Sequence, residues 1–227
     1  MVGPLVETKK EDTQRILKNL KVYLGKKKSS PMVFSFAKFF SKNPFIILVS
    51  CLLSLRSKDV MTIPVCMKLF DLAKTPKELL NIPVDQLEEV IRPIGFFRKK
   101  AIVLKSVSAQ IVDEFGGKVP RTEEELLSIG GVGRKTANLV LSVAFDIPAI
   151  CVDVHVHRIF NRLGLIKTKT PGQTEVALAK LFPKKKWSEI NELFVAFGQN
   201  VCTPTSPICS DCPIRFACEQ RGVARRR

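Results

Sequence analysis

The sequence predicts an all-α fold, on three observations. Apolar residues recur at helical spacing along most of the chain. Strict alternation of apolar and polar side chains, the pattern of a half-exposed strand, is confined to isolated short runs. Helix-capping patterns precede several of the apolar segments. With 227 residues, 45% of them hydrophobic, the chain is long enough to bury a core as one large domain or two small ones.

The first predicted helix runs from Glu11 to Leu24, because Ile16, Leu20 and Tyr23 fall on one helical face. The basic loop from Gly25 to Pro31 ends this helix and is a candidate domain boundary. We therefore expect an exposed connection between this helix and the next one.

A central core helix is predicted next. Asn43 and Pro44 form an N-cap and first-turn pair ahead of the segment from Phe45 to Leu55, which is almost entirely apolar. A helix without a polar face is buried on all sides. Thr75 and Glu78 form a capping box that opens a further short helix.

The later helices are predicted from the same apolar spacing and the same capping patterns. Ala101, Leu104, Ile111 and Phe115 mark a long helix that ends at a pair of glycines, Gly116-Gly117. The remaining predicted helices are Asp85 to Ile91, a short helix capped by Thr122, one from Asp153 to Gly164, one capped by Thr170, and Glu189 to Phe197.

A glycine turn, Gly130-Gly131-Val132-Gly133, lies between the helix capped by Thr122 and a helical segment from Arg134 to Phe145. Glycines allow positive φ and let another backbone approach closely. The N-terminus of the following helix carries unpaired N–H groups and the positive end of the helix dipole, so the turn predicts an anion site. The alternative is an ordinary helical turn with glycine caps.

Composition indicates the kind of partner. The chain has 37 Lys and Arg against 21 Asp and Glu, a net charge of +16, which favours a polyanion such as nucleic acid or an anionic membrane surface. The longest apolar run, Phe45 to Leu55, is shorter than the ~20 residues of a spanning helix. The first residues lack the apolar core of a signal peptide, so we expect no membrane and a reducing intracellular compartment, where disulfides are rare.

Four of the seven cysteines lie close together in sequence: Cys202, Cys209, Cys212 and Cys218. Four thiolates can bind a tetrahedral zinc ion or an iron–sulfur cluster, and the physics of ligation permits either. The other three, Cys51, Cys66 and Cys151, have apolar neighbours and are predicted to be small buried hydrophobic residues.

The segment GVGRKTAN, from Gly131 to Asn138, together with Val152-Asp153-Val154-His155, resembles the endonuclease III branch of the helix-hairpin-helix DNA glycosylases, and the resemblance covers nearly the whole chain. It implies that Lys135 is the catalytic nucleophile and Asp153 its electrostatic partner. It also implies that Gly131, Val132, Gly133 and Arg134 bind DNA. The alternatives are a lysine that only binds phosphate and an aspartate that only caps its helix.

The resemblance also implies a two-lobed fold. A six-helix barrel containing the hairpin is expected at residues 31–148, and a discontinuous iron–sulfur domain at residues 1–30 and 149–227. The spacing of Cys202, Cys209, Cys212 and Cys218 matches the [4Fe–4S] loop of this family, which favours a [4Fe–4S] cluster over zinc.

Two further residues are candidates for DNA contact by resemblance. Arg56 stands where the family commonly has a glutamine-bearing loop that enters the space left by an extruded base. Phe96 stands where the family has an apolar wedge between bases. The alternatives are a solvated charge at a helix end for Arg56 and, for Phe96 or Phe97, a side chain that packs the helix entry.

The implied function is base-excision repair of duplex DNA that contains oxidised pyrimidines or abasic sites. Lys135 would displace the base at C1′, and the Schiff base would then cleave the strand by β-elimination. An amine has to lose its proton before it attacks carbon, so Arg134, Arg158 and the helix N-terminus are expected to disfavour the charged form. We expect a monomer in the cytoplasm or nucleoid of a prokaryote. A non-catalytic DNA-binding module is the alternative.

Overall fold

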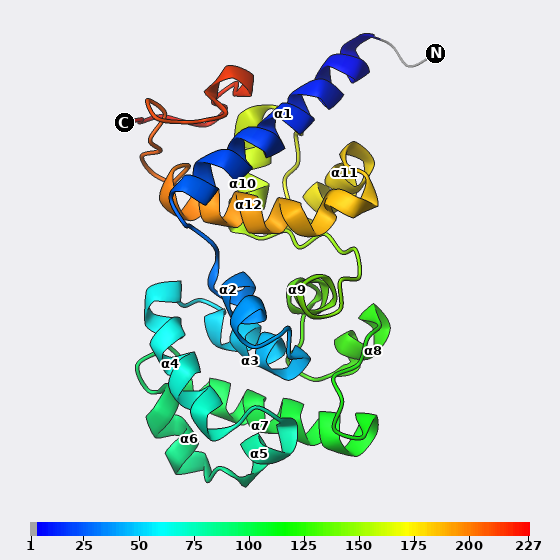
Figure 1. Cartoon of the computed structure of the whole chain (residues 1–227), viewed down its shortest axis with the longest axis vertical. Coiled ribbons are helices and arrows are strands. Elements are labelled where there is room, and N and C mark those ends of the chain that lie inside the picture. Colours follow the sequence, from blue (N-terminus) through cyan, green and yellow to red (C-terminus); the bar gives the residue numbers. More distant parts are fainter. Residues whose placement is uncertain (1–3) are drawn as a thin grey trace. The chain divides into compact units, whose positions relative to one another are not determined.

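The computed structural model describes residues 4–227, with side chains from Asp12 onward, and confirms the all-α fold: these residues form twelve α-helices and two 3₁₀ helices, without a strand. The chain divides into two compact units, whose helices are labelled in Figure 1. One unit is Met32–Ala149, and the other combines Met1–Pro31 with Ile150–Arg227. None of the described helices is both long and apolar enough to cross a membrane.

The unit Met32–Ala149 is built around α3 (Pro44–Ser54). Every residue of α3 from Phe45 to Leu53 is buried, which confirms the predicted core helix. The unit's other helices are α2 (Met32–Phe39), α4 (Asp59–Leu72), α5 (Pro76–Asn81), α6 (Val84–Ile91), α7 (Phe97–Phe115), α8 (Glu123–Ser128) and α9 (Arg134–Ala144), of which α2, α4, α7 and α9 contact α3.

Local capping chemistry sets most of the helix starts in this unit. The Asn43 side chain accepts hydrogen bonds from the backbone N–H groups of Phe45 and Ile46, at 3.0 and 3.2 Å. Thr75 and Glu78 form the predicted capping box of α5. Gly116, with φ 60°, ends α7 as predicted. These starts and stops depend on neighbouring residues only, and all of them are confirmed.

Two helices, α2 and α4, were not predicted. The lysine before α4 makes no side-chain cap hydrogen bond, and Pro64 lies inside the helix. Apolar residues of α4 also face solvent, among them Val60 and Met61, so the segment has no clean apolar face. The helix α2 has eight residues, rich in phenylalanine, and its helical state follows from packing on α3 rather than from a sequence pattern.

The long helix α7 is fixed to the segment around α5 by a lysine. The Lys105 Nζ donates hydrogen bonds to the backbone carbonyls of Leu79 and Leu80, at 2.9 and 2.8 Å, and also to that of Ile82. Carbonyls at a helix C-terminus otherwise lack partners, and a cation is favourable there. Burial lowers the pKa of Lys105. This contact holds α7 in the position against which the glycine turn packs.

The second unit joins the start of the chain to its end. Its helices are α1 (Pro4–Lys26), α10 (Val154–Leu163), α11 (Pro171–Leu181), η1 (Lys184–Lys186), α12 (Trp187–Asn200) and η2 (Arg215–Ala217). The helix α12 contacts both α1 and α10. Phe160 of α10 and Phe194 of α12 are buried with ring centroids 4.3 Å apart, so this core holds the N-terminal helix and the C-terminal third together.

Candidate active site and cysteine loop

The glycine turn between α8 and α9 packs against α7. The backbone N–H of Gly130 donates a 2.8 Å hydrogen bond to Oε1 of Gln110, and that of Val132 donates to the Ile129 carbonyl at 3.0 Å. Gly131 has φ +97°, and a Cβ added there would lie 2.9 Å from Cγ1 of Val103. Gly131 is therefore the one glycine of the turn that needs both the left-handed conformation and the absence of a side chain.

Replacing Gly131 by alanine is expected to lower the free energy of unfolding by about 1–3 kcal/mol, because the new Cβ adds backbone strain and a steric conflict with Val103. Urea denaturation followed by circular dichroism measures this loss. Gly133→Ala is the matched control, since Gly133 has φ −93° and no neighbour within 4 Å of an added Cβ. Equal stability of Gly131→Ala and the wild type would contradict the geometry of the turn.

The N-terminus of α9 follows the turn directly. Gly133 is its N-cap and provides no side-chain cap, and the first turn contains no acidic residue. The helix buries most of its length, whereas Arg134 and Lys135 at its start are exposed. The positive end of the helix dipole and two cationic side chains therefore lie together at one helix end, which is an arrangement that favours an anion.

Asp153 is the N-cap of α10. It lies in the unit that contains both ends of the chain, whereas Lys135 lies in the unit Met32–Ala149. Its Oδ1 accepts hydrogen bonds from the backbone N–H groups of His155 and Val156, both at 2.9 Å, and the residue is 9% exposed. Asp153 therefore caps α10. Both cap bonds use the same oxygen, so capping does not occupy Oδ2. The pairing of Asp153 with Lys135 stays a prediction.

Arg56 and Phe96, 40 positions apart in sequence, meet in the structure. The guanidinium carbon of Arg56 lies 4.6 Å from the centroid of the Phe96 ring. Both residues have left-handed backbones, with φ of 57° and 62°, which costs a non-glycine residue about 1–2 kcal/mol. Phe96 is 53% exposed, so its ring does not pack the helix entry in the core. Strain and exposure concentrated at one place are typical of a functional contact.

Lys100 fixes this pair, a role that sequence reasoning missed. Its Nζ donates hydrogen bonds to the Leu53 carbonyl at 2.7 Å and to Oγ of Ser57 at 3.0 Å, on either side of Arg56. Burial lowers the pKa of Lys100. Because Lys100 lies one helical turn after Phe96, it ties the Arg56 loop to the start of α7.

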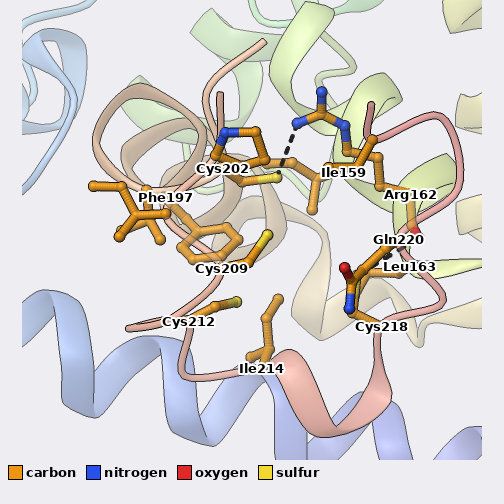
Figure 2. A pocket seen from close by; sticks show the side chains of 14 residues that line it. Ile159, Arg162, Leu163, Phe197, Cys202, Cys209, Cys212, Ile214, Cys218 and Gln220 are labelled. Carbon is orange, nitrogen blue, oxygen red and sulfur yellow. Dashed lines mark hydrogen bonds between the residues drawn. The ribbon is translucent and has the colours of Figure 1, made fainter. Parts of the chain in front are cut away.

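The four clustered cysteines line one pocket, shown in Figure 2, and the rest of its lining is mostly apolar, with Ile159, Leu163, Phe197 and Ile214 among the contributors. Each of the four is partly buried and reduced. In the part of the chain that the structure describes, no three His, Cys, Asp or Glu side chains are grouped so that they could hold a single metal ion. The four sulfurs thus share one pocket.

Burial acts on the cysteine thiols in both units. It raises the pKa of Cys212 to about 11 and also raises the pKa of Cys218. These thiols are protonated near neutral pH unless a metal displaces the proton. Burial raises the pKa of Cys66 to about 12. Cys51, Cys66 and Cys151 are all buried, which confirms them as small hydrophobic residues.

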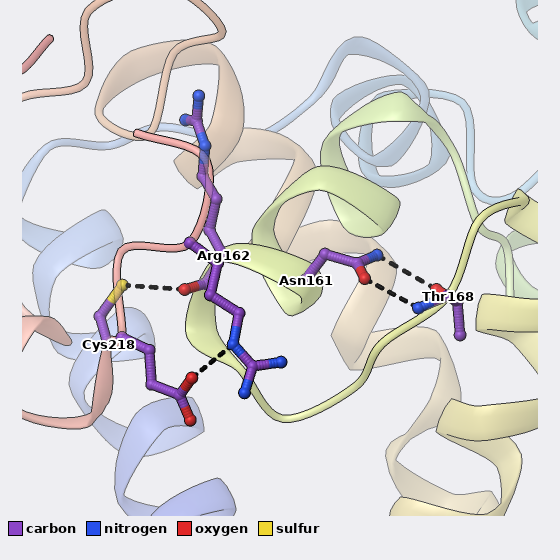
Figure 3. Close-up of polar contacts among 6 residues, drawn as sticks. Asn161, Arg162, Thr168 and Cys218 are labelled. Carbon is purple, nitrogen blue, oxygen red and sulfur yellow. Dashed lines mark hydrogen bonds and ion pairs between the residues drawn. The ribbon is translucent and has the colours of Figure 1, made fainter. Parts of the chain in front are cut away.

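Arg162, 7% exposed, holds the cysteine loop, and sequence reasoning missed it. Its Nη1 donates to Sγ of Cys202 at 3.4 Å and to the Thr203 carbonyl at 2.7 Å. Its own carbonyl lies 3.6 Å from Sγ of Cys218, as Figure 3 shows, and accepts from the Arg221 N–H at 3.1 Å. An arginine on the buried face of a helix was the available signal, since buried charges are almost always paired.

Arg158, one turn earlier on α10, also donates hydrogen bonds to this loop. Its Nη2 donates to the carbonyls of Gly198 and Cys202, at 3.2 and 2.8 Å. The turn after α10 is fixed by Asn161, whose amide bonds both to the Thr168 hydroxyl and to its backbone N–H, as Figure 3 also shows. These bonds direct the Arg158 guanidinium to the cysteine loop. Its predicted effect on Lys135, a residue of the other unit, stays a prediction.

The comparisons with known proteins agree with this fold. The family model described as "HhH-GPD superfamily base excision DNA repair protein" matches residues 49–184, more than half of the chain. The chain belongs to this superfamily. The predicted activity class, a DNA glycosylase and abasic-site lyase that acts in base excision repair, is confirmed.

Within the superfamily, the chain is similar to endonuclease III. It is 46% identical over 177 residues to endonuclease III of Thermotoga maritima, which covers 78% of this chain and 83% of that protein. A solved non-covalent endonuclease III–DNA complex superposes with a TM-score of 0.74 at 36% identity, over 83% of this chain and 92% of that one. A trapped endonuclease III–DNA covalent intermediate gives the same TM-score at 37% identity, with the same coverage of both chains.

Proposed function

We propose that this protein removes oxidised pyrimidines from duplex DNA by attack of Lys135 at C1′ and then cleaves the abasic strand by β-elimination. The observation that carries the proposal is the position of Lys135. It is an exposed amine in the first turn of α9, directly after the glycine turn, at a helix end without a side-chain cap. The likeness to an endonuclease III trapped covalently on DNA supports a covalent step.

The glycine turn would hold the DNA beside this amine. Backbone N–H groups of Gly131, Val132 and Gly133, with the guanidinium of Arg134, are the proposed ligands of a phosphate on the damaged strand. A phosphate at this place would accept hydrogen bonds from these donors and would also be stabilised by the positive end of the helix dipole. Such a contact fixes the register of the strand without reading its sequence.

The chemistry then follows from the amine. Nζ of Lys135 forms a bond to C1′ while the bond from C1′ to the base breaks and the base leaves with the electron pair and takes up a proton. The sugar ring opens to give a Schiff base, which acidifies C2′. Loss of a proton from C2′ expels the 3′ phosphate, and water later releases the lysine. In this proposal Oδ2 of Asp153 stabilises the positive charge that develops at C1′ and accepts a proton from the amine.

A duplex with a single thymine glycol tests this reaction. We expect release of the damaged base together with a nicked strand that carries the unsaturated aldehyde left by β-elimination. Product analysis by denaturing electrophoresis and mass spectrometry distinguishes the outcomes. Base release with an intact strand would show a water-using glycosylase, and binding without either product would show a DNA-binding module; both would overturn the proposal.

Arg56 and Phe96 are the proposed groups that enter the duplex where the damaged base leaves. An exposed aromatic ring replaces the lost stacking, and the arginine already packed on it can occupy the vacated space. Stacking of a base on an aromatic residue contributes about 1–3 kcal/mol. The anchoring of the Arg56 loop by Lys100 supports this role, because the pair is held in position before DNA binds.

Phe96→Ala is expected to weaken binding to a duplex with a stable abasic-site analogue by about tenfold or more, from the loss of stacking. Arg56→Ala is expected to have a smaller effect in the same direction. Fluorescence anisotropy measures both, with an undamaged duplex in parallel. Ile102→Ala is the matched control, because Ile102 is an apolar residue of the same helix and is 64% exposed. Equal weakening by Phe96→Ala and Ile102→Ala would contradict insertion.

A [4Fe–4S] cluster bound by Cys202, Cys209, Cys212 and Cys218 is the proposed cofactor. These residues fit such a cluster, because four thiols line one mostly apolar pocket. Arg162 also donates a hydrogen bond to the sulfur of Cys202. The spacing of these four cysteines, with one close pair and two longer arms, favours the cluster over zinc. When bound, the cluster would cross-link the loop to itself, while Arg158 and Arg162 join the loop to α10.

We propose that residues 31–148 act as the barrel domain, and that residues 1–30 and 149–227 act as the cluster domain. The enzyme would work as a monomer on duplex DNA in the cytoplasm or nucleoid of a prokaryotic cell. The net charge of +16 supports attraction to DNA, and the solved relatives bound to DNA point the same way.

A further inference from the structure

A groove in the unit that contains both ends of the chain lies apart from every residue assigned so far. Residues of α1 from Thr13 to Val22 form one wall, and residues from Leu181 to Glu189 form the other. Its volume is about 580 Å³. Sites that bind ligands usually measure roughly 300–1,000 Å³, so the groove is large enough for several side chains of a partner. Neither the glycine turn nor the cysteine loop contributes to it.

The floor of the groove is apolar. Leu17 and Phe182 are buried beneath it, Leu181 is partly buried, and Val22 is 54% exposed at its edge. The turn that presents Phe182 is fixed, because Nε1 of Trp187 donates a 3.0 Å hydrogen bond to the Phe182 carbonyl. A preformed apolar depression gains free energy when it is covered by apolar side chains, so the floor favours a partner that has them.

The rim of the groove is basic. Lys18 and Lys21 lie on α1, and Lys185 and Lys186 lie opposite. Glu189 pairs with both Lys21 and Lys186, each at 3.0 Å, whereas Lys18 and Lys185 form no ion pair with any residue whose side chain is described. Four lysines against one glutamate leave the rim positive.

We propose that this groove binds an acidic peptide segment of a partner protein, with the partner's apolar side chains on the floor and its carboxylates against Lys18 and Lys185. The apolar floor and the basic rim together favour a partner that has both apolar side chains and carboxylates. A DNA backbone could meet the lysines, but it has no apolar group to cover Leu17 and Phe182. An uncharged apolar peptide would cover the floor and leave the rim without a counter-charge.

The test uses the full-length protein and a fluorescent synthetic peptide in which a run of aspartates is followed by leucine and phenylalanine. A second peptide replaces leucine and phenylalanine by serine and keeps the charge. Anisotropy titrations near physiological salt compare the wild type with Lys18→Glu/Lys185→Glu. The control, Lys167→Glu/Lys169→Glu, makes the same change of net charge at exposed positions of the same unit outside the groove.

We expect the groove variant to bind the apolar-ended peptide about tenfold or more weakly, with the control variant near the wild type. The serine peptide should bind the wild type weakly. Equal losses in both variants, or equal binding of both peptides, would show attraction to net charge alone and overturn the proposal. Undamaged duplex DNA forms the third arm. If the groove variant loses DNA affinity as strongly as peptide affinity and the control does not, the groove is a DNA surface and the proposal fails.

Discussion

Replacing Lys135 by alanine is expected to reduce strand cleavage at an abasic site by about a thousandfold or more. The amine is the proposed nucleophile of both steps, and no neighbour on α9 can take its place, because Lys135 is the only lysine of that helix. Alanine is also a good helix former, so α9 is expected to remain folded. Single-turnover cleavage with enzyme in excess measures the effect free of product release.

DNA affinity should change much less than the rate. The chain carries a net charge of +16, and the glycine turn and Arg134 stay in place in the variant, so the loss of one cation is expected to weaken binding only a few-fold. Lys118→Ala is the control, because Lys118 is an exposed lysine of the same unit outside the predicted site. Cleavage by Lys135→Ala at the rate of the control variant would exclude Lys135 as the nucleophile.

Cys212→Ser is expected to remove most of the bound iron and to lower the melting temperature by more than about 5 °C. The segment from Cys202 to Cys218 has one 3₁₀ helix, Arg215–Ala217, as its regular structure. Backbone contacts and Arg162 hold it, and without a cluster the pocket at its centre would lose its cross-link. Iron and sulfide analysis, the visible absorbance and a thermal melt measure the two effects.

Cys66→Ala is the control for this variant. Burial raises the pKa of the Cys66 thiol to about 12, and its side chain lies in the core of the other unit, so it should keep all its iron. Some loss of stability is expected in the control from the smaller side chain. The iron content therefore decides the result. A Cys212→Ser protein with wild-type iron content and colour would contradict the cluster proposal.

Helix ends were the most predictable part of the fold. Asn43, Thr75, Asp153 and Thr170 cap the helices that they were predicted to cap, and Gly164 ends α10. Such capping depends on a few successive residues, which a sequence displays directly. The helices α2 and α4 were missed because their helical state depends on packing against α3 and not on a pattern of their own.

The candidate site was predictable in its residues but not in its contacts. The glycine turn, its following lysine and the cysteine spacing are local patterns. The contact between Arg56 and Phe96, the anchoring bonds of Lys100, and the bond from Arg162 to Cys202 join residues far apart in sequence. Only tertiary structure creates these contacts, and a single sequence contains no periodic signal for them.

The most direct test of the proposed mechanism is chemical trapping of the Schiff base. Wild type and Lys135→Ala are mixed with a duplex that contains one abasic site, in the presence of borohydride, which reduces an imine to a stable amine. We expect a covalent protein–DNA adduct for the wild type, attached at Lys135 by peptide mapping, and no adduct for the variant. Absence of an adduct from wild type that binds the same duplex, or an adduct through another amine, would contradict lysine attack at this position.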